Sequence, residues 1–243
     1  MKWFFNLISS IFSKEVKAEP RIEVPAPQAT TPEIPRAETS SSHVGVGAVT
    51  HALDLSHHNE SVDFLQLRNQ GLVILKATEG ASGVDKRFNS RFSGLKVCGI
   101  RRGAYHFYRT NRDPIVQAEH FLATVGELQA GDVLALDYET CDIKGLVQTI
   151  ADLKVHKGNA LKFLLHIEKV TGIKCKFYTY HNVIQEVGFG AEFAEYDLWY
   201  ARYTSNTPAP AQGPWNKIWM WQYSDKGTVP GVTGDVDMNW MSV

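Results

Sequence analysis

Near its middle the chain reads Leu134-Ala135-Leu136-Asp137-Tyr138-Glu139, an apolar run that ends in two carboxylates. Short apolar runs of this kind predict buried strands. On a strand, side chains at positions i and i+2 leave the same face about 6.5–7 Å apart, so we expect Asp137 and Glu139 to stand side by side. Two carboxylates in one cleft cannot both ionise easily, and the pKa of one of them is raised. A fold obtains a general acid beside a charged partner in this way. If the pair is considered alone, the alternative to a catalytic pair is two acids at a strand end that enters a solvated loop.

Strand-like and helix-like segments alternate on both sides of this stretch. The sequence predicts strands at residues 49–55, 72–77, 103–108, 133–137, 176–180, 197–200 and 218–222, and helices at residues 114–125 and 159–171. Strands separated by helices favour parallel crossovers and an α/β fold. Polar and aromatic residues follow the strand ends, where barrel enzymes build their sites, and the chain is short for eight complete βα units. We therefore expect an incomplete or modified (β/α) TIM-like barrel.

The composition changes sharply near residue 48. Residues 18–47 are rich in alanine, proline, glutamate, threonine and serine, which predicts a disordered linker. Residues 1–17 have Lys2 near their start and continue with apolar side chains, including Trp3-Phe4-Phe5 and Leu7-Ile8. This segment is either an export signal or an amphipathic anchor that docks on a membrane or a protein partner. Both alternatives predict a protein that is exported, or delivered to its place of action by a partner, with residues 48–243 as its folded domain.

Charge and cysteine content exclude several classes of function. The formal net charge is −1, so no basic groove for nucleic acid is expected. Cys98, Cys141 and Cys175 form no CxxC pair and no cluster at zinc-binding spacing, and their odd number argues against a disulfide framework. The sequence therefore predicts neither a metal nor an organic cofactor.

Eight short motifs occur in order along the folded part. They are Asp54-Leu55-Ser56-His57-His58, Leu75-Lys76-Ala77-Thr78-Glu79-Gly80, Gly103-Ala104-Tyr105-His106-Phe107, Asp137-Tyr138-Glu139, Phe177-Tyr178-Thr179, Leu198-Trp199-Tyr200-Ala201-Arg202-Tyr203, Trp221-Gln222-Tyr223-Ser224 and Val236-Asp237-Met238-Asn239. Together they resemble the family 25 glycoside hydrolases, the N-acetylmuramidase lysozymes, over residues 50–240. The resemblance implies a modified barrel of eight strands with fewer helices. It also implies cleavage of the β-1,4 bond between N-acetylmuramic acid and N-acetylglucosamine in peptidoglycan.

The same resemblance implies roles for four acids. Glu139 matches the general acid of the family and Asp137 the carboxylate beside it. Asp54, which closes the first predicted strand, and Asp237, which is expected to close the last, match two further acids of the cleft. The first and last strands of a barrel are neighbours, so these two should lie close together. We expect Glu139 to be the least solvated of the four and to have a raised pKa for that reason. Turn or capping roles are the alternatives for Asp54 and Asp237.

The spacing of the acids leaves the stereochemistry open. Glycosidase carboxylates stand about 5–5.5 Å apart in retaining enzymes and about 6.5–9.5 Å apart in inverting ones, and positions i and i+2 fall between these ranges. The resemblance implies retention, with the 2-acetamido group of the substrate as nucleophile. In that scheme Asp137 orients the amide and Tyr178 donates a hydrogen bond to the same group.

Aromatic and basic side chains near the strand ends are candidates for binding sugar. Tyr105 and Phe107 share one strand face, and Trp199 and Trp221 lie near later strand ends. Their rings can stack on the apolar faces of pyranoses, while ordinary core packing is the alternative. Lys76 ends a buried strand, where a lysine needs an acidic partner, and we expect that partner among the four acids.

Three functions compete on this basis. The first is an active, wall-degrading muramidase whose partner is the glycan strand of peptidoglycan. The second is a catalytically silent wall-binding module, and the third is a structural or cargo protein in which residues 1–17 are the functional element. The presence of all four acids favours the enzyme.

Overall fold

The computed structural model describes residues 49–206, 208–209 and 212–242. The predicted targeting segment, residues 1–17, and the predicted linker, residues 18–47, lie outside these ranges. The strands are β1 (Val49–Leu55), β2 (Leu72–Glu79), β3 (Gly83–Val84), β4 (Arg102–Phe107), β5 (Val133–Asp137), β6 (Lys176–Tyr180), β7 (Leu198–Ala201), β8 (Met220–Gly227) and β9 (Val236–Ser242). The helices are α1 (Phe88–Val97), α2 (Pro114–Val125), α3 (Ile150–Thr171), α4 (His181–Val187) and the 3₁₀ helix η1 (Ala191–Glu195).

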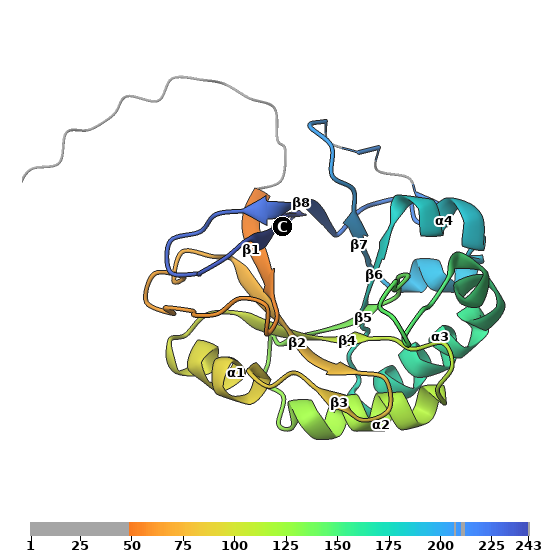
Figure 1. The fold of residues 1–243 in the computed structure, drawn as a ribbon, viewed down its shortest axis with the longest axis horizontal. Coiled ribbons are helices and arrows are strands. Elements are labelled where there is room, and N and C mark those ends of the chain that lie inside the picture. Colours follow the sequence, from red (N-terminus) through yellow and green to blue (C-terminus); the bar gives the residue numbers. More distant parts are fainter. Residues whose placement is uncertain (1–48, 207, 210–211, 243) are drawn as a thin grey trace, which may run out of the picture. The chain divides into compact units, whose positions relative to one another are not determined.

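Eight of these strands close into a barrel in the order β1-β2-β4-β5-β6-β7-β8-β9, and β9 returns to β1. Neighbouring strands from β1 through β8 are parallel, whereas β9 runs antiparallel to both β8 and β1. The short β3 pairs with β2 outside the ring. Figure 1 shows this ring with the helices on its outside. The predicted fold class, a modified TIM-like barrel with fewer helices, is confirmed.

Side chains along each strand alternate between two cores. Ala135 of β5 belongs to the core inside the barrel, whereas Leu134 and Leu136 belong to the larger core that also contains the helix residues Phe121 and Phe163. Burying one such side chain stabilises the fold by roughly 1.5–3 kcal/mol. The same alternation turns Asp137, two residues after Ala135, toward the inside of the barrel.

Helix α3 begins nine residues before the predicted start at residue 159. Its first turn is held by a capping box, in which Thr149 and Asp152 accept hydrogen bonds from each other's backbone N–H groups. The prediction missed this turn because Lys154, Lys157 and Gly158 interrupt the apolar pattern there. In contrast, α2 begins and ends at the predicted residues.

The strand β9 corrects one expectation about the acids. Asp237 does not close the last strand but lies at its beginning. Because β9 is antiparallel, its first residues lie at the end of the barrel where the parallel strands finish, and Asp237 pairs directly with Asp54 of β1. The expected proximity of the two carboxylates is therefore found, by a different route through the sheet.

The hairpin from β8 to β9 also leaves the outer faces of β8, β9 and β1 without a covering helix (Figure 1). A crossover helix is needed only between parallel strands, which explains how fewer residues complete the barrel. Among the described residues, no helix has both the length and the apolar character needed to cross a bilayer.

Candidate active site

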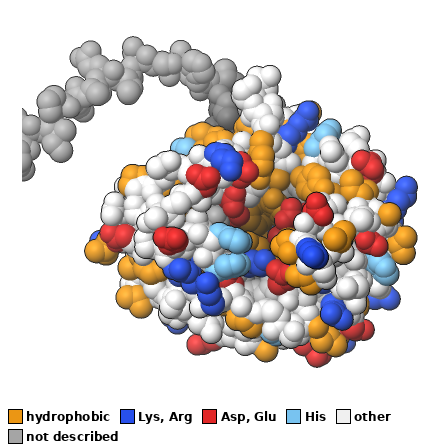
Figure 2. All heavy atoms as spheres, viewed as in Figure 1, with side chains coloured by type: hydrophobic (Ala, Val, Ile, Leu, Met, Phe, Trp, Pro, Cys, Tyr) orange, Lys and Arg blue, Asp and Glu red, His pale blue; other side chains and the backbone are white. Residues whose placement is uncertain are grey.

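A cavity of about 180 Å³ opens at the end of the barrel where the parallel strands finish. Figure 2 looks into this end and shows acidic side chains around a hollow. The lining residues are Asp54, Tyr105, Asp137, Glu139, Tyr178, Trp199, Tyr203, Gln222 and Asp237. All four predicted acids and three of the predicted substrate-binding residues thus meet in one place, although they come from six different strands or strand ends.

Asp54 and Asp237 form a pair of neighbouring acids in the cavity. The two residues are direct partners across β1 and β9, so their side chains leave the same face of the sheet. Gln222 Nε2 and Asn239 Nδ2 donate to Asp54 Oδ2 at 2.9 and 2.8 Å, which favours its charged form. Burial, together with the nearby charge of Asp54, raises the pKa of Asp237 to about 9. Burial raises the pKa of Asp54 as well, but its hydrogen bonds with Asn239 and Gln222 oppose that shift, so we expect Asp237 to be the member of the pair that holds a proton.

Asp137 and Glu139 lie at the end of β5. Tyr138 between them faces the outer core, where its hydroxyl donates to the Leu153 carbonyl at 2.6 Å, so the two acids point together into the cavity. Burial and the charge of Glu139 raise the pKa of Asp137 well above its usual range. Burial also raises the pKa of Glu139, to about 7, although Lys76 and Arg109 oppose this shift.

The least solvated member of this pair is Asp137, contrary to the expectation for Glu139. Asp137 is the last residue of β5 and only 5% exposed, whereas Glu139 follows two residues beyond the strand and is half-buried. The Oδ1 atom of Asp137 is buried and has no hydrogen-bond partner among the described residues. A buried acceptor of this kind is costly unless a donor reaches it.

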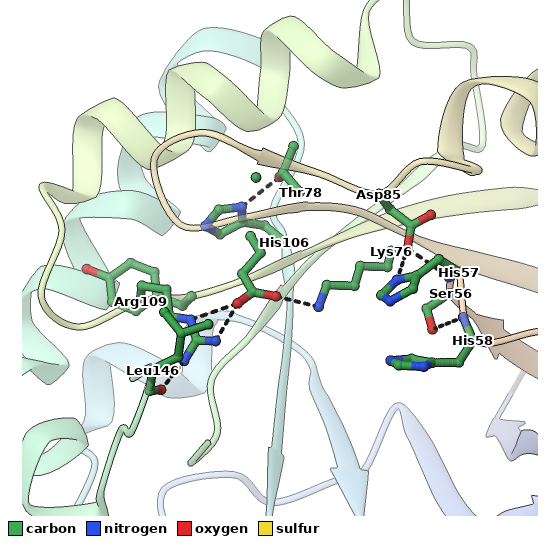
Figure 3. A network of polar contacts seen from close by, with 12 residues as sticks. Ser56, His57, His58, Lys76, Thr78, Asp85, His106, Arg109 and Leu146 are labelled. Carbon is green, nitrogen blue, oxygen red and sulfur yellow. Dashed lines mark hydrogen bonds and ion pairs between the residues drawn. The ribbon is translucent and has the colours of Figure 1, made fainter. Parts of the chain in front are cut away.

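Lys76 binds an acid that the sequence analysis did not consider. Its Nζ atom lies 2.7 Å from Glu79 Oε2, not against one of the four cavity acids. Arg109 reaches the other oxygen of Glu79, with Nε at 3.0 Å, and donates through Nη1 to the Leu146 carbonyl (Figure 3). Glu79 thereby holds two cations near Glu139, and their positive charges oppose the rise in the pKa of Glu139.

The backbone of Glu139 is fixed by Gln148. The Gln148 amide donates to the Glu139 carbonyl at 2.7 Å and to the Tyr108 carbonyl at 3.0 Å, and its oxygen accepts from the Thr110 N–H at 2.7 Å. Gln148 is 4% exposed. This buried amide connects the segment that follows β5 to the segment that follows β4, and so holds the general-acid candidate in place.

The sequence analysis assigned no role to Gln222 and Asn239, which connect the polar groups of the cavity. Gln222 Oε1 accepts from the hydroxyls of Tyr178 and Tyr203 at 3.0 and 2.9 Å. Asn239 Oδ1 accepts from Trp199 Nε1 at 2.7 Å. Both amides also bind Asp54, as described above. Uncharged amides carry no strong signal in a sequence, and only the register of β8 with β9 brings these two together.

The predicted aromatic platforms differ in position. Tyr105 lines the cavity, but Trp199 is 1% exposed and meets Tyr178 edge to face at 4.8 Å, so it forms the floor and offers no free ring face. Phe107 lies beside the cavity under Lys76 and Arg109, each 4.8 Å from its ring centre. Tyr203 is 54% exposed at the rim, and it has the accessible ring.

Trp221, which was predicted to bind sugar, is not among the residues that line the acidic cavity. Its neighbours Met220 and Gln222 face the inside of the barrel, so Trp221 faces the outside. There its Nε1 donates to the Arg202 carbonyl at 2.8 Å and its ring lies 5.6 Å from that of Tyr223. A shift of one residue along the strand decides which side chain enters the site.

The comparisons with known proteins agree with this geometry. The family described as "Glycosyl hydrolases family 25" matches residues 53–232. The protein of Escherichia coli strain K12 named "Uncharacterized protein YegX" is 31% identical over 196 residues, which cover 78% of this chain and 68% of that protein. The autolytic lysozyme of Clostridium acetobutylicum is 30% identical over 195 residues, which cover 78% of this chain and 55% of that protein.

Solved structures of lysozymes are also similar to this chain. The bacterial lysozyme from Streptomyces coelicolor matches with a TM-score of 0.70 at 25% identity, over 80% of this chain and 92% of that one. A family GH25 lysozyme from Aspergillus fumigatus matches with a TM-score of 0.68, also at 25% identity, over 81% of this chain and 95% of that one. The match to the family spans most of the folded domain, and it includes Asp54, Asp137 and Glu139. This chain belongs to glycosyl hydrolase family 25.

Proposed function

We propose that the protein is a muramidase that hydrolyses the β-1,4 bond between N-acetylmuramic acid and N-acetylglucosamine in peptidoglycan. The observation that carries the proposal is the position of Glu139, half-buried in a cavity with three other acids, with a pKa raised to about 7. A carboxyl group with such a pKa holds a proton at neutral pH and can deliver it to a leaving group.

In the first step, Glu139 protonates the glycosidic oxygen as the bond from that oxygen to the anomeric carbon breaks. The carbonyl oxygen of the substrate's 2-acetamido group attacks the anomeric carbon and forms a cyclic oxazolinium ion. In the second step, water attacks the same carbon and gives its proton to the Glu139 carboxylate, which restores the acid. Such substrate assistance is established for some glycosidases.

Asp137 is suited to assist the acetamido group. Its buried Oδ1 lacks a donor among the described residues, and the amide N–H of the substrate can supply one. That hydrogen bond favours the charged form of Asp137, which then stabilises the positive charge of the oxazolinium ion. Tyr178 lies directly across the sheet from Asp137, and its hydroxyl can turn from Gln222 toward the acetamido oxygen.

Release of reducing ends from purified peptidoglycan tests the proposal. The wild-type protein should release them, and Glu139→Gln should fold normally but lose at least about a hundredfold in rate, because general acid catalysis contributes about 10²–10⁴-fold. Asp137→Asn should lose activity while still binding a muropeptide. A wild-type protein that binds peptidoglycan without releasing reducing ends would identify a silent binding module instead.

A further inference from the structure

A second cavity, of about 420 Å³, adjoins the acidic one on the side of β6 and β7. The two share Glu139, Tyr178 and Tyr203 as common walls, so a substrate bound across Glu139 extends into both. The far wall of the second cavity is formed by different side chains, which include Arg202 and His181. We call it the Arg202 cavity.

The guanidinium of Arg202 is the distinctive charge of this cavity. Throughout the described ranges, no carboxylate lies within 4.0 Å of it, whereas Lys76 and Arg109 both bind Glu79. The cavity on the opposite side, beside β2 and β3, contains the paired groups Lys76 with Glu79 and His57 with Asp85. The exposed Lys86 also lines that opposite cavity and has no such pair among the described residues, but of the two flanking cavities only the Arg202 cavity shares Glu139 with the acidic cavity, so Arg202 is the cation placed beside a substrate bound across Glu139.

The strand neighbours fix the position of Arg202. Its N–H donates to the Gln222 carbonyl at 3.0 Å, and its own carbonyl accepts from Trp221 Nε1 at 2.8 Å. Burial raises the pKa of Tyr200, and the nearby Arg202 guanidinium partly opposes this increase. The Tyr200 hydroxyl lies 2.8 Å from His181 Nδ1. Arg202 is exposed, and it lines the cavity together with His181.

We propose that the Arg202 cavity binds a carboxylate of the stem peptide that muramic acid carries, with the Arg202 guanidinium as its partner. The proposal rests on the muramidase function proposed above. In intact peptidoglycan the lactyl carboxyl group of muramic acid is consumed in an amide bond, so the free carboxylates belong to the peptide. The first cavity is lined by four acids and no cation, so it offers a carboxylate no partner of opposite charge, whereas a guanidinium binds carboxylate by charge-assisted, bidentate hydrogen bonds. Asn182, which also lines the cavity, adds an amide that suits a peptide backbone.

Kinetics on two forms of one substrate test the proposal. The first form is soluble, uncross-linked peptidoglycan with its stem peptides, and the second is the same glycan after an amidase has removed them. Arg202→Gln should raise KM on the first form about tenfold, the value expected from losing one charge-assisted hydrogen bond, and leave the stripped glycan unaffected. Arg202→Lys should recover part of the loss. Arg68→Gln is the matched control, because Arg68 is exposed and lines none of the three cavities.

Three outcomes would overturn the proposal. An equal loss on both forms would assign Arg202 to the sugar, no loss would leave it without a role in binding, and a larger loss on the stripped glycan would assign it to the lactyl carboxylate. A wild-type protein inactive on both forms would instead refute the proposed muramidase function.

Binding measurements distinguish a failure of the Arg202 proposal from a failure of the proposed muramidase function. In the Glu139→Gln background, Arg202→Gln should weaken the dissociation constant for a soluble disaccharide tetrapeptide about tenfold and that for the peptide-free disaccharide not at all. Equal weakening of both ligands, or of neither, would overturn the assignment of the Arg202 cavity whether or not the protein is an enzyme.

Discussion

Glu139 is under opposing influences from its neighbours. Burial and the carboxylate of Asp54 raise its pKa, while Lys76 and Arg109 lower it, and the result is a value of about 7. Glu79 holds both cations in position. The sequence predicted the acid but not this balance, because Lys76 and Glu79 lie on one strand end and Arg109 comes from the segment after another. The tuning depends on the neighbouring positions of β2 and β4 in the sheet.

The first prediction concerns the pH dependence of hydrolysis. The general acid works in its protonated form, so activity should fall as pH rises through about 7, the pKa of Glu139. Lys76→Met removes a positive charge that lowers this pKa, and the alkaline limb of the kcat/KM profile should therefore move to higher pH. Lys86→Met is the control, since the exposed Lys86 lines the neighbouring cavity but is absent from the groups that shift Glu139. A downward shift for Lys76→Met would contradict the electrostatic account.

The second prediction concerns stability at the Asp54–Asp237 pair. The folded-state pKa of Asp237 is about 9, against an ordinary value of 3.8. A raised pKa stabilises the folded state fully below the unfolded pKa, and this contribution is lost as pH rises through the folded value. Asn at position 237 can still donate to Asp54 but cannot ionise. The free energy of unfolding of Asp237→Asn, measured in urea, should therefore increase relative to wild type between about pH 4 and 9. A difference that is constant with pH, or that shrinks, would show that Asp237 is not the group that keeps the proton.

The position of a strand in the sheet determines which of its side chains enter the site, and short sequence motifs do not reveal this. The apolar run of β5 and the two acids after it were predicted correctly, because alternation on one strand is a local property. Trp221 was predicted to bind sugar and Gln222 was given no role, since an aromatic ring at a strand end suggests a sugar platform and an amide carries no such signal. The direction of β9 was missed because the predicted strand ended at residue 222, whereas β8 continues to Gly227. The short segment left between Gly227 and Val236 suits an antiparallel hairpin and is too short for a parallel crossover.

Helix α3 supports the site from behind, because the Tyr138 hydroxyl donates to its Leu153 carbonyl. We predict that Thr149→Ala, which removes the side-chain cap on Asp152 N–H, lowers the free energy of unfolding by about 1 kcal/mol. The variant should keep the wild-type KM, since Thr149 lines none of the three cavities. Thr171→Ala at the other end of α3 is the matched control, because its hydroxyl caps no N–H of the first turn. Equal destabilisation by both changes would rule out a special contribution of the capping box.

At the scale of the whole molecule, the barrel is asymmetric in a way that suits a long polymer. Helices lie outside one part of the ring, while the outer faces of β8, β9 and β1 have no covering helix (Figure 1). The site lies at one open end of the barrel (Figure 2), and two further cavities lie beside β6 and β7 and beside β2 and β3. Four acids line this one cavity although the formal net charge of the whole chain is only −1. A concentrated negative site in a nearly neutral protein raises the pKa of its own acids, and the chemistry proposed for Glu139 depends on this.

The final prediction concerns the segments before the barrel. Every described strand begins at or after Val49 and every proposed site residue lies at or after Asp54. A chain that begins at Gly45 should therefore melt at the wild-type temperature and keep its kcat/KM on soluble fragments, because no described ladder hydrogen bond or buried side chain is removed. It should lose delivery instead, since residues 1–17 are proposed to serve export, membrane docking or loading onto a partner. Fractionation of cells that produce the full and shortened chains measures this. A shortened protein that melts early, or that fails on soluble substrate, would place the domain boundary before residue 45.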